Sequence, residues 1–150
     1  MNKRFIYFSH TGNGDYLAEY LSKRGYEITK VNEKSKLPKS FFFSMMVGGF
    51  RSGLGLKGKL IDYHPDLSPE EEVIIGSPIW NGRLVPAINA VLAQTDLSNR
   101  KLTFLLYCGG GEAPKAVAKL SSRYPDAFIL VLKEPKKHPE ELSRLEDMIR

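Results

Sequence analysis

The sequence has little of what builds disulfide-stabilised, metal-binding or membrane proteins. Cysteine occurs once, at Cys108, so no intrachain disulfide can form and a reducing, cytoplasmic location is expected. The three histidines, His10, His64 and His138, lack metal-ligand spacing, so we expect no metal site. The apolar run near the N-terminus is too short for a signal peptide or a membrane span, so we expect no membrane insertion.

Composition and charge limit the class of protein. A length of 150 residues with 42% hydrophobic content fits one domain, residues 1–150. The net charge is +5, yet segment 23–59 holds nine Lys and Arg against two Glu, and segment 60–99 holds six acids against one Arg. This segregation favours an acidic partner, although a simply solvated surface explains it equally well. Without zinc-finger, helix-turn-helix or RNA-recognition motifs, nucleic-acid binding is not expected.

Five short apolar segments predict the strands of a sheet. The last three are almost continuous Val, Ile, Leu and Phe, as is typical of parallel strands buried on both faces. Helical segments separate the strands, and three of them begin at Pro86, Pro114 and Pro139. The alternation predicts an α/β fold with a three-layer, doubly wound, five-stranded parallel sheet. The predicted strands are Phe5–Phe8, Tyr26–Val31, Glu72–Gly76, Thr103–Cys108 and Ala127–Leu132.

Segment 39–60 is the least regular part of the chain. An apolar run, Phe41–Val47, precedes five glycines that should end any helix begun there. We expect a helix packed on the sheet and then an irregular connection. A flap over a ligand is the functional alternative, because long loops in compact domains are often functional.

A turn rich in hydroxyl groups and glycine joins the first strand to a helical stretch, Tyr16–Leu21. Its sequence is Ser9-His10-Thr11-Gly12-Asn13-Gly14. Backbone N–H groups at the start of a helix, together with neutral hydroxyls, favour a bound phosphate. The turn lacks the lysine of a Walker loop and the third glycine of a dinucleotide fingerprint, so a phosphate monoester fits better than a nucleoside triphosphate or NAD.

Two other segments follow predicted strands at the same edge of the sheet. Gly76–Gly82 carries the single tryptophan, Trp80, which is either a core residue or a stacking surface for a planar ring. We expect stacking, because Trp80 follows a buried strand at the ligand edge. Cys108–Glu112 contains three glycines that allow a flat ligand to approach the backbone, and the alternative is a flexible turn. We expect Cys108 itself to be a buried small residue rather than a redox thiol.

The three segments together resemble the flavodoxin family over nearly the whole chain, and least over residues 34–63. The resemblance implies the strand order 2-1-3-4-5 and bound FMN. It implies that the FMN phosphate is held by the side chains of Ser9, Thr11 and Asn13 and by the backbone of His10, Gly12, Asn13 and Gly14. It further implies that Pro78, Ile79, Trp80, Asn81 and Gly82 hold the flavin ring and that Cys108, Gly109, Gly110 and Gly111 contact its pyrimidine edge.

Three features depart from the family pattern. Gly14 stands where flavodoxins often carry Thr or Ser, which removes one phosphate ligand. The tyrosine that commonly covers the outer face of the ring is missing, so Tyr107 would have to turn outward to serve. Flavodoxins are typically acidic, whereas this chain has a pI near 9.3.

The resemblance leaves three functions open. The first is a one-electron carrier between redox partner proteins, with acidic partners suggested by the charge. The second is an NAD(P)H-dependent FMN or quinone reductase, favoured by an open ring face. The third is a non-redox binding module with the same fold. We favour the carrier, because the chain is short and lacks a nicotinamide motif.

Overall fold

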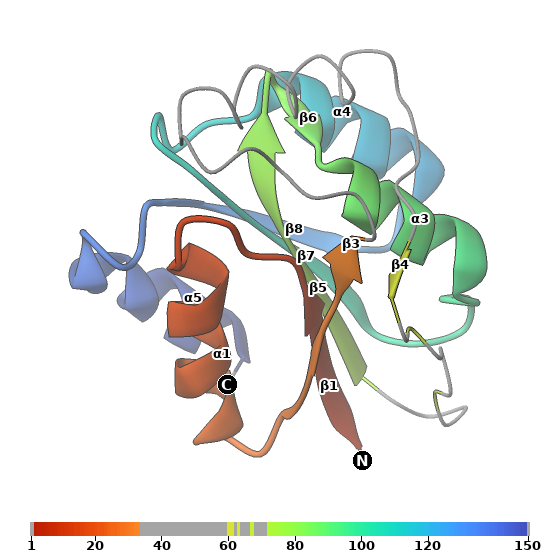
Figure 1. Ribbon diagram of the computed structural model, residues 1–150, viewed down its shortest axis with the longest axis horizontal. Coiled ribbons are helices and arrows are strands. Elements are labelled where there is room, and N and C mark those ends of the chain that lie inside the picture. Colours follow the sequence, from red (N-terminus) through yellow and green to blue (C-terminus); the bar gives the residue numbers. More distant parts are fainter. Residues whose placement is uncertain (1, 34–59, 62, 64–66, 68–71, 150) are drawn as a thin grey trace.

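A computed structural model describes residues 2–33, 60–61, 63, 67 and 72–149. Its centre is a parallel sheet in the order β2-β1-β5-β7-β8 (Figure 1). In chain order of these five strands this is 2-1-3-4-5, so the predicted α/β class and strand order are confirmed. The strands are β1 (Lys3–Tyr7), β2 (Glu27–Lys30), β5 (Glu72–Trp80), β7 (Leu102–Cys108) and β8 (Phe128–Lys133).

Short antiparallel strands extend this arrangement. β6 (Arg83–Leu84) pairs with β5, and β3 (Asn32–Glu33) pairs with β4 (Leu60–Ile61) in a separate two-stranded sheet. Except for Leu60, the segment predicted as helix or flap, 39–60, lies outside the described residues.

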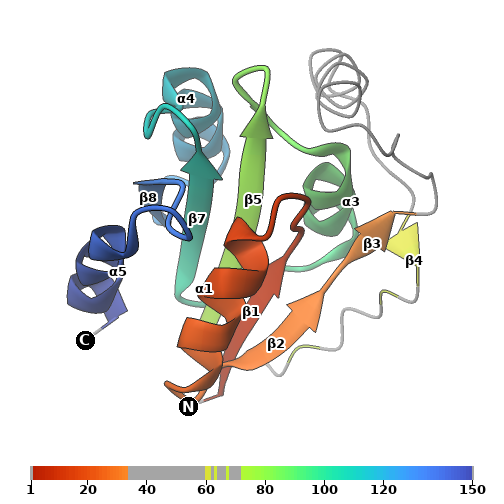
Figure 2. The same ribbon diagram turned by 60° about the vertical axis from the view of Figure 1, so that its left-hand side comes forward.

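Helices cover both faces of the sheet. α1 (Asn13–Ser22) and α5 (Leu142–Ile149) pack on one face, and α3 (Pro86–Gln94) and α4 (Pro114–Arg123) pack on the other (Figures 1 and 2). Prolines begin α3 and α4, as expected from the fixed φ of proline in the first turn. The last predicted helix starts as a 3-10 turn, η1 (Pro139–Glu141), and continues as α5. None of the helices in the described part of the chain is long and apolar enough to cross a membrane.

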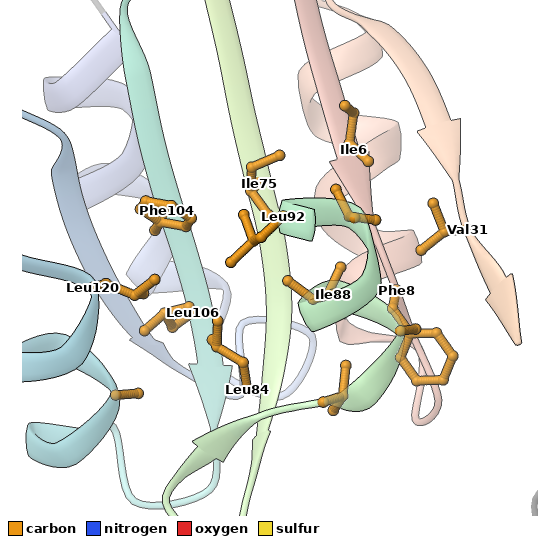
Figure 3. Packing of buried hydrophobic residues seen from close by; sticks show 14 of the residues in the cluster. Ile6, Phe8, Val31, Ile75, Leu84, Ile88, Leu92, Phe104, Leu106 and Leu120 are labelled. Atoms are coloured by element: carbon orange, nitrogen blue, oxygen red, sulfur yellow. The ribbon is translucent and has the colours of Figure 1, made fainter. Parts of the chain in front are cut away.

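Alternate residues of the central strands fill two separate cores. Ile6, Ile75 and Phe104 point toward α3 and α4, where they meet Ile88 and Leu120 (Figure 3). Their neighbours Phe5, Ile74 and Leu105 face α1 and α5. Because both faces are covered, the central strands carry apolar residues on both faces, which explains the nearly continuous apolar runs in the sequence.

β5 is longer than the sequence analysis predicts. The predicted strand ends at Gly76, whereas β5 continues to Trp80 and turns through Asn81 and Gly82 into β6. Asn81 and Gly82 have φ of 53° and 74°, the left-handed values that an Asn-Gly hairpin turn requires. The interpretation of 76–82 as a loop is therefore wrong, and the Asn-Gly pair was the signal for a hairpin.

The outer strand β8 has one neighbour in the sheet, β7. On its other side, the Arg144 Nη1 atom of α5 donates a hydrogen bond to the Val131 carbonyl oxygen at 2.8 Å. Phe128, at the start of β8, is 59% exposed.

Candidate functional site

A cleft of about 460 Å³ lies at the carboxyl ends of the central strands. Four segments line it, and three of them are those predicted from the sequence. The fourth, 134–137, follows β8 and was not predicted. The cleft-lining residues are Thr11 and Asn13, then Pro78, Ile79 and Trp80, then Tyr107, Cys108 and Gly109, and finally Glu134, Lys136 and Lys137.

The turn before α1 has the geometry of an anion site. Gly12 adopts φ of 95°, and its carbonyl accepts the first helical bond, from the Tyr16 N–H at 2.9 Å. The earlier N–H groups of the turn therefore remain for a ligand, at the positive end of the helix dipole. Across the described residues, the Ser9 Oγ atom is buried and has no hydrogen-bond partner. A buried hydroxyl without a partner is costly, and a polar group bound at this position would satisfy it.

Close packing explains why residue 14 is glycine. A Cβ atom on Gly14 would lie 2.7 Å from the Tyr107 hydroxyl oxygen, 2.7 Å from the Tyr7 ring and 2.8 Å from Ser9 Cβ. Carbon atoms essentially never approach this closely, so the two tyrosines exclude any larger residue. The departure from the flavodoxin pattern at Gly14 therefore follows from the aromatic residues that surround it.

Replacing Gly14 by serine should lower the free energy of unfolding by about 1–3 kcal/mol, because the new side chain must displace Tyr7 or Tyr107. Urea denaturation of the FMN-free protein measures the change. Gly110→Ser is the matched control, since a Cβ there meets nothing within 4 Å, and its effect should stay within about 0.5 kcal/mol. Equal stability of the two variants would contradict the packing argument.

Tyr107 does not turn outward. It is buried, and its hydroxyl donates to the Phe8 carbonyl oxygen at 2.5 Å. Burial, together with the nearby Tyr7 and Asp15, raises the pKa of Tyr107 well above its ordinary value, so the hydroxyl stays protonated. Tyr107 therefore does not take the outward orientation that the sequence analysis required of it to cover the ring.

The carboxylate in the first turn of α1, Asp15, is paired with neighbouring side chains. The Asp15 Oδ1 atom accepts a hydrogen bond from the Tyr7 hydroxyl at 2.7 Å and pairs with the Lys30 ammonium at 2.9 Å. Partial burial raises the pKa of Asp15, but hydrogen bonds from Lys30 and Tyr7 and the charges of Lys30 and Lys136 outweigh it, so the pKa is lowered. Asp15 is therefore ionised but paired, which reduces its repulsion of a bound anion.

Lys136 is one of the cleft residues that the sequence analysis did not predict, together with Glu134 and Lys137 of the same loop. Its backbone N–H donates to the Asn13 Oδ1 atom at 3.1 Å, which ties the loop after β8 to the start of α1. Its ammonium nitrogen lies 3.1 Å from where a Cβ on Gly12 would stand. The turn thus combines neutral donors with one cation. The available signal was topological, because the loop after β8 leaves the same edge of the sheet as the three predicted segments.

Trp80 belongs to both the core and the cleft. It is 4% exposed, and its ring meets Phe8 and His10 edge-on, each with a centroid distance of 5.9 Å. Packing in the core is by itself a sufficient reason for a tryptophan at this position. Its place in the cleft wall also allows it to contact a ligand. Stacking on a flavin ring stays a prediction.

Several predicted residues do not line the cleft, namely Ser9, His10, Gly12, Gly14, Asn81, Gly82, Gly110 and Gly111. Asn81 and Gly82 form the hairpin turn, and Gly82 lines a different cavity. Gly110 is exposed, and Gly111 adopts φ of 74°. The Cys108 thiol is partly exposed and donates to the Glu112 carbonyl oxygen at 3.5 Å, so the expectation that Cys108 is buried is wrong. The roles of these residues toward a flavin stay predictions.

The strand order, the two helical layers and the cleft at the strand ends define a flavodoxin-like fold. Three solved structures share it. A candidate flavoprotein from Bacteroides eggerthii has a TM-score of 0.71 and 17% identity, with 99% of this chain and 98% of that chain covered. A candidate flavoprotein from Bacteroides uniformis has a TM-score of 0.70 and 18% identity over 85% of each chain.

The third structure is a flavoprotein from Lactobacillus acidophilus in complex with FMN. Its TM-score is 0.68 at 14% identity, with 93% of this chain and 97% of that chain covered. No protein-family model matches the chain. A search of curated proteins found no match. Identities this low establish the fold that the chains share.

Proposed function

We propose that the chain binds FMN in the cleft and acts as a redox protein. The observation that carries the proposal is the buried Ser9 hydroxyl, which has no hydrogen-bond partner in the described part of the chain and lies in the turn before α1. A phosphate monoester would satisfy this hydroxyl together with the free N–H groups of the turn. The similar chain from Lactobacillus acidophilus, crystallised with FMN, supports the choice of ligand.

Each wall of the cleft has a role in this proposal. The side chains of Ser9, Thr11 and Asn13 and the ammonium of Lys136 hold the phosphate. Pro78 to Gly82 position the ring, and the backbone of Cys108 to Gly111 contacts its pyrimidine edge. FMN supplies the redox chemistry when it is bound, and the protein supplies its position and electrostatic surroundings.

The proposed role is one-electron transfer between partner proteins, including acidic ones. The excess of basic residues in the whole chain supports acidic partners, although most of segment 23–59 lies outside the described residues. An NAD(P)H-dependent FMN or quinone reductase is the second candidate. The inward orientation of Tyr107 favours it, because no aromatic side chain from that position covers the ring.

Replacing Ser9 and Thr11 together by alanine should weaken FMN binding at least about tenfold, because hydrogen bonds to a charged group are lost. Riboflavin, which has no phosphate, should bind almost as before. Calorimetric titration with both ligands measures the difference, and Ser121→Ala on exposed α4 is the control. Equal loss of affinity for both ligands would show that the turn does not hold the phosphate.

Anaerobic titration of the FMN-loaded protein distinguishes the two roles. The carrier should be bleached by dithionite and not directly by NAD(P)H. Direct bleaching by NAD(P)H would establish the reductase instead. If the protein shows no flavin spectrum after incubation with FMN and removal of unbound FMN, both the carrier and the reductase are contradicted.

A further inference from the structure

A second cavity, of about 300 Å³, lies between β6, α3 and α4. Its inner wall is formed by Leu84, Leu92, Ala116 and Leu120, all of which are buried. Figure 3 shows Leu84, Leu92 and Leu120 on the face of the sheet that α3 and α4 cover. A cavity of this size and lining suits the apolar part of a small molecule.

Cations surround the mouth of this cavity. Lys115, Lys119 and Arg123 occur at intervals of four residues on α4, and Arg83 of β6 also lines the cavity. None of the four forms an ion pair within the described residues. Arg123 also lies 5.3 Å from the centre of the Tyr124 ring.

Without a bound anion, the spacing of the α4 cations destabilises this helix. Like charges four residues apart lie on one side of a helix and destabilise it. A bound anion would relieve this repulsion, and the apolar wall behind the cations would shelter the rest of the same molecule from water. The charges and the wall therefore favour one kind of ligand, with an acidic group at one end and an apolar body.

We propose that the cavity between β6, α3 and α4 is a binding site for a small organic anion with an apolar body, such as an aromatic or medium-chain carboxylate. The carboxylate contacts the cations of α4 and Arg83, and the apolar body contacts the leucines. The site is separate from the FMN cleft and does not depend on FMN binding.

The two sites share one structural element. Ile79 and Trp80 of β5 line the FMN cleft, and Gly82, Arg83 and Leu84, beyond the hairpin turn, line the second cavity. Lys115 approaches the same turn, since its Cδ atom lies 3.7 Å from where a Cβ on Gly82 would stand. An anion in the second cavity therefore binds beside the hairpin that also forms a wall of the cleft.

Calorimetric titration with 2-naphthoate tests the proposal. The neutral analogue 2-naphthamide, of nearly the same shape, measures how much of the affinity comes from charge. We expect 2-naphthoate to bind at least about tenfold more tightly than 2-naphthamide. We expect the same affinity with and without FMN, because the ligand does not enter the cleft. A lack of 2-naphthoate binding, equal affinity for the two compounds, or loss of binding when FMN is added would overturn the proposal.

Surface variants locate the site. K115Q/K119Q should weaken 2-naphthoate at least about fivefold, because two of the cations are removed. K23Q, at the far end of α1, removes an exposed charge elsewhere and should leave the affinity unchanged. In ¹H–¹⁵N spectra, 2-naphthoate should shift the amide signals of Leu84, Ala116 and Leu120. Unchanged affinity in K115Q/K119Q, or shifts confined to the FMN cleft, would overturn the assignment of the site.

Discussion

Replacing Trp80 by alanine is expected to lower the free energy of unfolding by about 3–5 kcal/mol. The side chain is 4% exposed and packs edge-on against Phe8 and His10, so its removal leaves a large cavity in the core. Urea denaturation of the FMN-free protein measures the loss. A change below about 1 kcal/mol would show that Trp80 is not part of the core.

A second measurement separates core packing from contact with the flavin. Indole stacked on a flavin should quench its fluorescence, so Trp80→Phe should raise the emission of bound FMN while preserving most of the core volume. Phe104→Ala is the matched control, because Phe104 is fully buried in the middle of β7 and is not a cleft residue. It should destabilise the fold and leave the emission unchanged. If Trp80→Phe also leaves the emission unchanged, Trp80 acts as a core residue alone.

Replacing Lys136 by glutamate is expected to weaken FMN binding by about a hundredfold and riboflavin binding only slightly. The ammonium of Lys136 lies close to Gly12, in the turn that we propose holds the phosphate, so the substitution would put a carboxylate beside a dianion. Lys136→Met, which removes the charge without reversing it, should give an intermediate loss of about tenfold. Fluorescence titration with both ligands measures the two variants.

The salt dependence of FMN affinity and a charge change at a distant position provide two further checks. FMN affinity of the wild-type protein should fall as salt rises, and the dependence should be weaker in Lys136→Met. Lys23→Glu changes the net charge by the same amount as Lys136→Glu at the opposite end of α1, and should leave FMN affinity nearly unchanged. Equal effects at positions 23 and 136 would mean that only the total charge matters.

Local sequence patterns were sufficient to predict the sheet. Each of these patterns can be read from residues that are neighbours in the sequence. They are the continuous apolar runs of β5, β7 and β8 and the prolines at the starts of α3 and α4. The turn from Ser9 to Gly14 could be proposed as a phosphate site for the same reason, since such a site at a helix start is built from consecutive residues. The strand order followed from the resemblance to flavodoxins.

Features that depend on distant residues were not predicted. Lys136 reaches the turn before α1 only because β8 ends at the same edge of the sheet as β1. The need for glycine at position 14 depends on Tyr107, which lies in another strand. The length of β5, by contrast, was available locally, because Asn81-Gly82 is a strong hairpin signal that we interpreted as part of a loop. Because Gly76–Gly82 was interpreted as one ligand-binding loop, the hairpin was not predicted.

The hydrogen bond from Arg144 to the Val131 carbonyl has a consequence for the behaviour of the protein at high concentration. An outer strand with free backbone groups can pair with another molecule and start aggregation. β8 carries the exposed Phe128, which would favour such pairing. By occupying one carbonyl of this strand with a bulky, charged side chain, α5 blocks part of the edge. We therefore expect α5 to hinder self-association through this edge as well as covering the sheet.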